Sequence, residues 1–211
     1  KKGSEPTDRY SHLKIVTMVG FVMGIHAFIY LIIKDFNYNP IDMLRYLPVS
    51  AMYIISMTIG YIGLRYIELS IAAPVQNSAG AVSAILLFIF FPREMHYLDV
   101  MAVIIITAGV IGLAMIEKRI EDRVRQLEGH KIDPKYQLSV MAITFPILYA
   151  IIDGLGTFAD GIYLDELELI SEDAALLSYE FTFFSVALGS YIYVRYIKKQ
   201  PFIILKERDR T

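Results

Sequence analysis

The 211-residue sequence contains no cysteine, which excludes disulfide bonds and thiolate metal sites in this chain. Its four histidines are not spaced like metal ligands. There is no excess of basic charge to attract nucleic acid, because 20 Lys and Arg stand against 22 Asp and Glu. No HExxH, GxSxG, P-loop or GxGxxG pattern occurs, and no Ser, His and acid grouping stands out. The sequence therefore predicts neither an enzyme nor a metal or cofactor site.

Charge of either sign is scarce, at 20% of positions, whereas apolar and aromatic residues make up 55% and the mean hydropathy is +0.49. An α-helix needs about 20 residues to cross a hydrocarbon core roughly 30 Å thick. Helices of a soluble protein would keep a polar face, and the long apolar runs here do not. We therefore predict an all-α membrane protein, a polytopic bundle of about six transmembrane helices surrounded by lipid. The predicted helices are 15–33, 47–64, 69–91, 98–116, 138–159 and 174–194.

The connections between these segments differ sharply in charge. If alternate connections share a side, one side collects seventeen Lys and Arg and the other collects three. By the positive-inside rule the first side is cytoplasmic, and the protein is a multi-pass protein of the cell membrane. The segment 160–173, with six acids and no base, is then outside. The segment 117–137 is a charged linker on the cytoplasmic side.

The stretch 61–115 carries the most distinctive motifs. A helix end with Tyr and Leu leads into Ala-Ala-Pro at 72–74, then into the loop sequence FPREM at 91–95 and the Gly-rich GVIGL at 109–113. This order resembles the third to fifth helices of an EamA-type half in the drug/metabolite transporter superfamily. The resemblance implies a secondary transporter of small polar metabolites, such as amino acids or related solutes, that works by alternating access.

The resemblance also implies a ten-helix fold built from two inverted five-helix repeats. On that basis residues 1–116 form a first half that lacks its first helix, and 138–211 begin the second half. We therefore expect a fragment of a longer protein. Family members commonly keep both termini cytoplasmic, which would place the linker outside; we follow the charges instead. The expected partners are the bilayer and a small-molecule solute, without nucleic acid, and a homodimer remains open.

Three titratable residues inside the spans are candidates for proton coupling: His26, Asp153 and Glu180. An ionisable group against lipid costs at least about 2.5 kcal/mol, so such residues are functional candidates. Asp153, beside Gly154, is the strongest, unless its helix ends near residue 152 and Asp153 caps a re-entrant piece. Glu180 could instead reach interfacial water, and His26 could be an ordinary interhelical donor.

Further polar residues are candidates for lining a solute cavity. Pro74 loosens the start of the 69–91 segment, and Asn77 and Ser78 follow it with neutral hydrogen-bonding groups. Tyr61 and Tyr149, like Asp153, could face the same cavity, although tyrosine is also common in interfacial belts. A non-transporting membrane scaffold or accessory subunit remains the alternative function.

Overall fold

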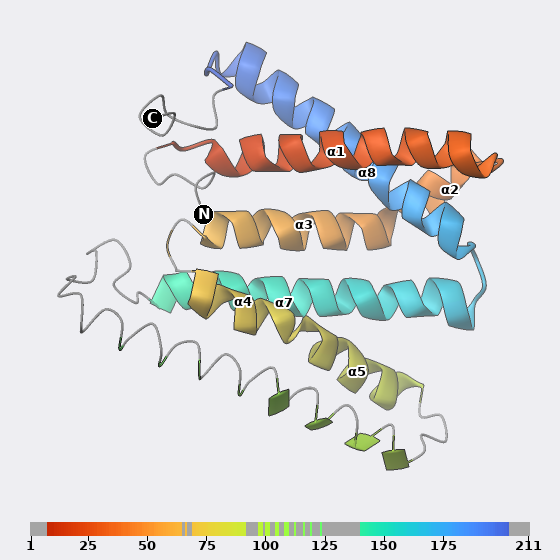
Figure 1. The fold of residues 1–211 in the computed structure, drawn as a ribbon, viewed down its shortest axis with the longest axis vertical. Helices are drawn as coiled ribbons and strands as arrows, with labels where there is room; N and C mark the ends of the chain where they lie inside the picture. Colours follow the sequence, from red (N-terminus) through yellow and green to blue (C-terminus); the bar gives the residue numbers. More distant parts are fainter. Residues whose placement is uncertain are drawn as a thin grey trace.

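The computed structural model describes residues 8–64, 66, 69–91, 140–202 and scattered positions between 97 and 123. Within this part of the chain all regular structure is helical, as predicted. Figure 1 shows α1, α3 and α7 running side by side, with α8 and α5 crossing them obliquely. The helices are α1 (Ser11–Lys34), α2 (Pro40–Arg45), α3 (Leu47–Gly63), α4 (Leu69–Asn77), α5 (Ala79–Phe90), α7 (Val140–Gly161) and α8 (Glu172–Ile192). Helices α7 and α8 continue into π-helical turns, Ile162–Glu166 and Tyr193–Ile197.

Three helical segments are long and apolar enough to cross a membrane: Ser11–Lys34, Thr144–Glu166 and Glu172–Ile197. Two shorter apolar helices, Leu47–Gly63 and Val75–Phe90, lie beside them. The predicted span 98–116 lies largely outside the described residues, as does most of the 117–137 linker. Large apolar side chains cover the outer faces; Ile32, for example, is 81% exposed. Exposed apolar faces of this extent suit helices surrounded by lipid.

The prediction of one continuous helix over 69–91 is wrong, because the chain breaks at Ser78 between α4 and α5. We expected the disturbance at Pro74, four residues earlier. At the break the Ser78 hydroxyl donates to the Val75 carbonyl at 2.6 Å, and the Ser78 amide donates to the same oxygen at 3.2 Å. A serine side chain that bonds a nearby carbonyl competes with the helical hydrogen-bond ladder. Helix α4 therefore ends at the polar residues that follow the proline.

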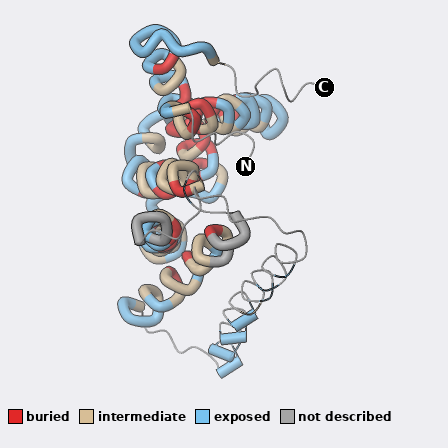
Figure 2. Tube along the Cα trace, turned by 90° about the vertical axis from the view of Figure 1, so that its left-hand side faces the viewer, coloured by how far each residue is buried: buried red, intermediate tan, exposed pale blue. Residues whose placement is uncertain are grey.

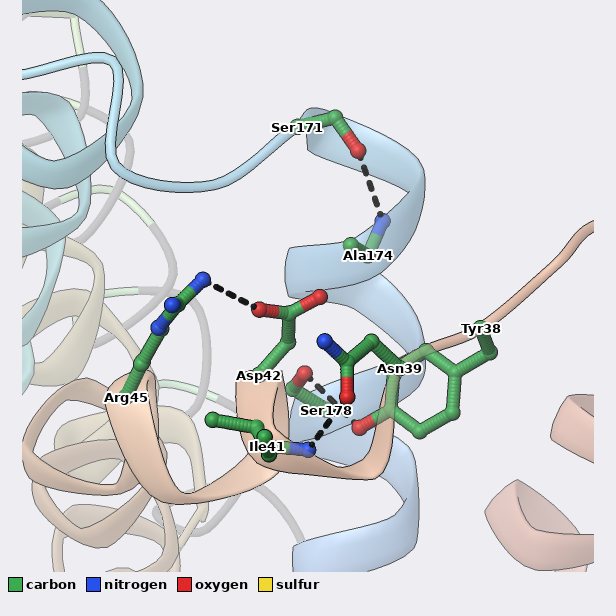
Figure 3. Close-up of polar contacts among 8 residues, drawn as sticks. All are labelled: Tyr38, Asn39, Ile41, Asp42, Arg45, Ser171, Ala174 and Ser178. Atoms are coloured by element: carbon green, nitrogen blue, oxygen red, sulfur yellow. Dashed lines mark hydrogen bonds and ion pairs between the residues drawn. The ribbon is translucent and has the colours of Figure 1, made fainter.

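The short helix α2 was not predicted, although its local signals are clear. Pro40 begins it, and the Asn39 side chain accepts a hydrogen bond from the Ile41 amide at 3.1 Å. Proline in the first turn and asparagine at the N-cap both favour a helix start. Figure 3 shows this cap beside the contact between Tyr38 and Ser178, which joins the segment to α8.

Glycines bring the long helices into close contact. A Cβ atom added at Gly20 would lie 2.5 Å from the Ala187 Cβ and 2.6 Å from the Phe183 carbonyl oxygen. A Cβ at Gly24 would overlap the Phe184 ring. Small residues allow such close approach of helices in a bilayer, where no hydrophobic force draws them together. The spacing of Gly20 and Gly24 therefore serves the packing of α1 on α8, and Figure 2 shows the buried positions gathered between the helices.

The connections between the described helices gather at two ends, with α1 and α3 running in opposite directions and α5 and α7 running in the same direction. At one end the segment after α1 and the segment between α7 and α8 line a common cavity. At the other end Tyr10 lies against Tyr193, with 6.3 Å between ring centroids, and Tyr66 stacks on Phe145. This arrangement places the acid-rich segment 160–173 opposite the start of α1.

Candidate functional site

Asp153 lies in the middle of α7, where it faces α3. Its Oδ1 accepts a hydrogen bond from the Ser56 hydroxyl at 2.8 Å, and Ser56 is fully buried. Because α7 runs unbroken from Val140 to Gly161, the alternative in which the helix ends near residue 152 is wrong. The Ser56 hydroxyl also lies 2.8 Å from the Tyr53 carbonyl oxygen. One hydroxyl hydrogen thus serves two acceptors.

Three tyrosines from α3, α7 and α8 lie close enough to Asp153 to interact electrostatically with its carboxyl: Tyr53, Tyr149 and Tyr179. The Tyr53 and Tyr179 rings meet edge to face, with centroids 5.7 Å apart. Of the predicted cavity residues, Tyr149 therefore lies near Asp153, whereas Tyr61 lies near Tyr149 and Tyr179.

The break between α4 and α5 packs against the same part of α7. A Cβ at Gly154 would lie 2.8 Å from the Ala79 carbonyl oxygen, and a Cβ at Gly60 would lie 3.1 Å from the Gln76 Nε2. Glycine at these positions lets the broken helix, α4 and α5, approach α3 and α7 closely. Of the two other predicted cavity residues, Asn77 is exposed and the Ser78 hydroxyl is used by the Val75 carbonyl.

Two adjacent cavities open toward the acidic end of the bundle. The inner cavity, of about 250 Å³, is lined by Tyr46, Tyr53, Tyr179, Asp160 and Glu172 together with apolar side chains. The Tyr46 hydroxyl donates to the Asp160 carboxylate there. The outer cavity, of about 640 Å³, shares Leu164 and Glu172 with the inner one, so the two lie side by side. Its polar lining residues are Asn37, Asp42, Arg45, Asp165, Glu168, Ser171 and Glu172.

The other two proton-coupling candidates form a pair between α1 and α8. The His26 Nδ1 lies 2.7 Å from the Glu180 Oε1. The Glu180 side chain is 7% exposed, whereas that of His26 is 54% exposed, and the Glu180 Oε2 has no hydrogen-bond partner among the described residues. The alternative in which Glu180 reaches interfacial water is therefore not supported. One turn along α1, the Tyr30 hydroxyl donates to Asp173 at 2.7 Å.

The predicted site residues thus separate into two places, with Asp153 in one and His26 and Glu180 in the other. Sequence reasoning missed Ser56, the hydrogen-bond partner of Asp153. It also missed the inner cavity, with Tyr46, Tyr53, Tyr179 and Asp160 in its lining. A helical signal was available, because Tyr149, Asp153 and Asp160 follow the i, i+4, i+11 spacing of one helix face. No group of residues suited to hold a metal ion occurs in the described part of the chain.

Comparison with known proteins identifies the family. A model of the EamA-like transporter family matches residues 6–115, which is just over half of the chain and includes α1 to α5. No curated protein and no solved structure matches the chain. The resemblance seen in the 61–115 motifs is confirmed, and the match extends it toward the start of the sequence. The chain belongs to the EamA-like transporter family.

Proposed function

We propose that this protein is a secondary transporter that moves small polar metabolites, amino acids or related solutes, across the cell membrane by alternating access. Membership of the EamA-like family supports membrane transport in general. The observation that carries the rest is the Asp153 carboxyl, bonded to Ser56 between two apolar helices and next to the break between α4 and α5.

Buried carboxylates and broken helices are both typical of solute sites in membranes. An ionisable group within a span is costly and is found where a solute or ion must be bound. A helix break frees backbone groups that a solute can contact. In our proposal Asp153, Tyr61 and Tyr149 line the solute site, and Asn77 and Ser78 reach it when the broken helix moves.

Proton coupling is supported by the hydrogen-bond geometry at Ser56. Its single hydroxyl hydrogen faces both the Tyr53 carbonyl and Asp153, each at 2.8 Å. A protonated Asp153 would donate to Ser56 and leave the serine hydrogen for Tyr53, so that both bonds are satisfied. In our proposal the Asp153 carboxyl gains and loses a proton during the transport cycle. The His26–Glu180 pair is a second proton-binding site.

The wider architecture remains part of the proposal. Ten helices in two inverted halves, with residues 1–116 in the first and 138–211 in the second, would place the inner cavity near their junction. The acid-rich end that holds both cavities would face outward, and the base-rich 117–137 linker would face the cytoplasm.

The proposal is tested by uptake of radiolabelled amino acids into proteoliposomes under an imposed pH gradient. We expect uptake above that of empty liposomes, with the dependence on the pH gradient lost in Asp153→Asn and reduced in Glu180→Gln. Asp35→Asn, which removes a carboxylate outside both cavities, is the matched control and should behave like the wild type. Unchanged rates and pH dependence in both variants would rule out coupling through these carboxyls.

A non-transporting membrane scaffold is the second candidate, and one observation favours it. His26 and Glu180 contact each other, whereas Asp153 contacts Ser56 elsewhere in the bundle. A single transport site would bring all three titratable groups together. In that case the proteoliposomes would take up no solute, whatever the gradient, and Asp153→Asn would change only the stability of the protein.

A further inference from the structure

The inner cavity combines aromatic walls with carboxylates. Tyr46, Tyr53 and Tyr179 form its aromatic part, and Asp160 and Glu172 carry its charge. No basic residue is among its lining side chains in the described part of the chain. Ammonium groups bind where aromatic rings and negative charge converge, since the π-face attracts a cation.

The outer cavity, beside the inner one, is also lined mostly by negative charge. Across the two cavities five carboxylates stand against one guanidinium, that of Arg45. The Arg45 Nη1 already lies 3.1 Å from the Asp42 Oδ1, as Figure 3 shows, so its charge is locally balanced. A cleft lined by one sign of charge concentrates ions of the opposite sign. The charge that lines the two cavities therefore favours cations over anions.

From these two cavities we infer that the inner cavity is a second solute seat, next to the site proposed at Asp153, and that it selects a cationic amine: the ammonium group rests among Tyr46, Tyr53 and Tyr179 and is balanced by Asp160. This inference rests on the proposed transport function and narrows its substrate class. A carboxylate on the same solute would meet Asp160 and Glu172, so a zwitterion binds less well than a net cation. A neutral solute of the same shape keeps the apolar contacts but gains neither the ring nor the carboxylate attraction.

Three small probes of nearly the same shape test the inference on the unmodified protein: choline, its uncharged isostere 3,3-dimethylbutan-1-ol, and the zwitterion glycine betaine. Equilibrium binding to the full chain in detergent micelles is measured for each by calorimetry. We expect choline to bind at least about tenfold more tightly than either analogue. The inference would be overturned if choline bound no more tightly than the isostere, or no more tightly than betaine. It would also be overturned if choline did not bind at all. This comparison needs no variant and so does not depend on any variant folding.

Variants then locate the seat. Tyr179→Leu removes one ring and should weaken choline binding by about tenfold, while the isostere changes by less than about threefold. Asp160→Asn should have a similar selective effect. Asp35→Asn, at the same end but outside both cavities, and Tyr196→Leu, at the opposite end, are the matched controls. Choline affinity that is insensitive to both Tyr179→Leu and Asp160→Asn would overturn the placement.

Failure of the inference and failure of the proposed function give different results. If amino-acid uptake continues while choline binds no more tightly than its isostere, the transport function is supported and the cation preference is ruled out. If choline binds selectively but no solute enters the proteoliposomes, the cation seat is supported and the transport function is ruled out.

Discussion

The α1–α8 and α3–α7 interfaces hold buried carboxyls in opposite ways. Between α1 and α8, Glu180 meets a titratable partner, His26, and the surrounding contact is closed by glycine against backbone. Between α3 and α7, the Asp153 carboxyl accepts a hydrogen bond from the Ser56 hydroxyl, and Tyr53 of α3 lines the inner cavity. Glycine closes this interface too, since a Cβ at Gly60 would lie 2.9 Å from the Tyr149 Cδ2. The two interfaces differ in the partner of the carboxyl, which is an imidazole in the first and a hydroxyl in the second.

This contrast separates two tasks that the sequence presents as one. A carboxyl paired with histidine can exchange a proton within the pair, whereas a carboxyl held by a serine accepts the hydroxyl hydrogen when ionised and can donate to the hydroxyl oxygen when protonated. The following predictions test whether the two interfaces really differ in this way.

The largest effect is expected at Gly20 on the α1–α8 interface. Gly20→Leu would push a side chain into the Phe183 carbonyl and the Ala187 methyl, and we expect a loss of at least about 3 kcal/mol in stability. The matched control is Gly189→Leu on α8, where no atom lies within 4 Å of an added Cβ. Thermal unfolding in detergent, followed by far-UV circular dichroism, measures both. Equal losses in the two variants would mean that α1 and α8 are not closely packed at Gly20.

The next effect concerns the His26–Glu180 pair. His26→Ala leaves a carboxyl that is 7% exposed without its partner, and we expect a cost of about 1–3 kcal/mol. Glu180→Gln should recover part of that loss in the His26→Ala background, because a neutral amide is less costly to bury than an unpaired carboxylate. A double-mutant cycle from thermal unfolding measures the coupling. Strictly additive effects would show that the two side chains do not interact.

On the other interface, Ser56→Ala should cost about 1 kcal/mol, because Asp153 loses the hydroxyl donor that the fully buried Ser56 provides. Thr58→Val is the control, since the Thr58 hydroxyl donates to the Ile54 carbonyl of its own helix at 2.7 Å. If Thr58→Val destabilises the protein as much as Ser56→Ala, the Ser56–Asp153 bond has no specific role in joining α3 to α7.

The smallest effect lies at the acidic end, where Tyr38 bonds Ser178 of α8 at 2.9 Å. Burial raises the pKa of the Tyr38 hydroxyl above its ordinary value, so the folded protein keeps this proton to higher pH than the unfolded chain. The resulting stability is present below about pH 10 and is lost as pH rises through the raised pKa. Tyr38→Phe should therefore lower stability slightly at neutral pH and flatten its fall in alkali, as measured by unfolding at several pH values. An equally steep fall in the variant would contradict this.

The spans and the buried titratable residues could be predicted because both are local properties of the sequence. A run of apolar residues marks a helix in lipid, and one acid within it, such as Asp153, stands out at once. The break at Ser78 was not predicted: the sequence suggested one helix over 69–91 that is loosened near its start by Pro74. A side-chain hydroxyl and a missing backbone donor compete within the same turn, and sequence alone does not rank them.

The partners of those residues could not be predicted, because they depend on how helices pack. Ser56 and Asp153 are 97 positions apart in sequence, and His26 and Glu180 are 154 apart. Which helix faces which is decided by contacts such as Gly20 on Phe183, where interaction energies are summed over many atoms. The titratable residues can be identified from the sequence, but their contacts depend on how the helices pack.

Three residues with left-handed backbone, Asp35, Glu168 and Lys199, follow helical segments of the long spans. Glycine would adopt this conformation without the steric cost, about 1 kcal/mol or more, that an L-residue incurs. Each of the three instead carries a charge that matches its end of the bundle, acidic beside the cavities and basic at the opposite end. Glycine at these positions would therefore relieve a local backbone cost, but it would remove two acids from the end that holds the cavities and one base from the opposite end.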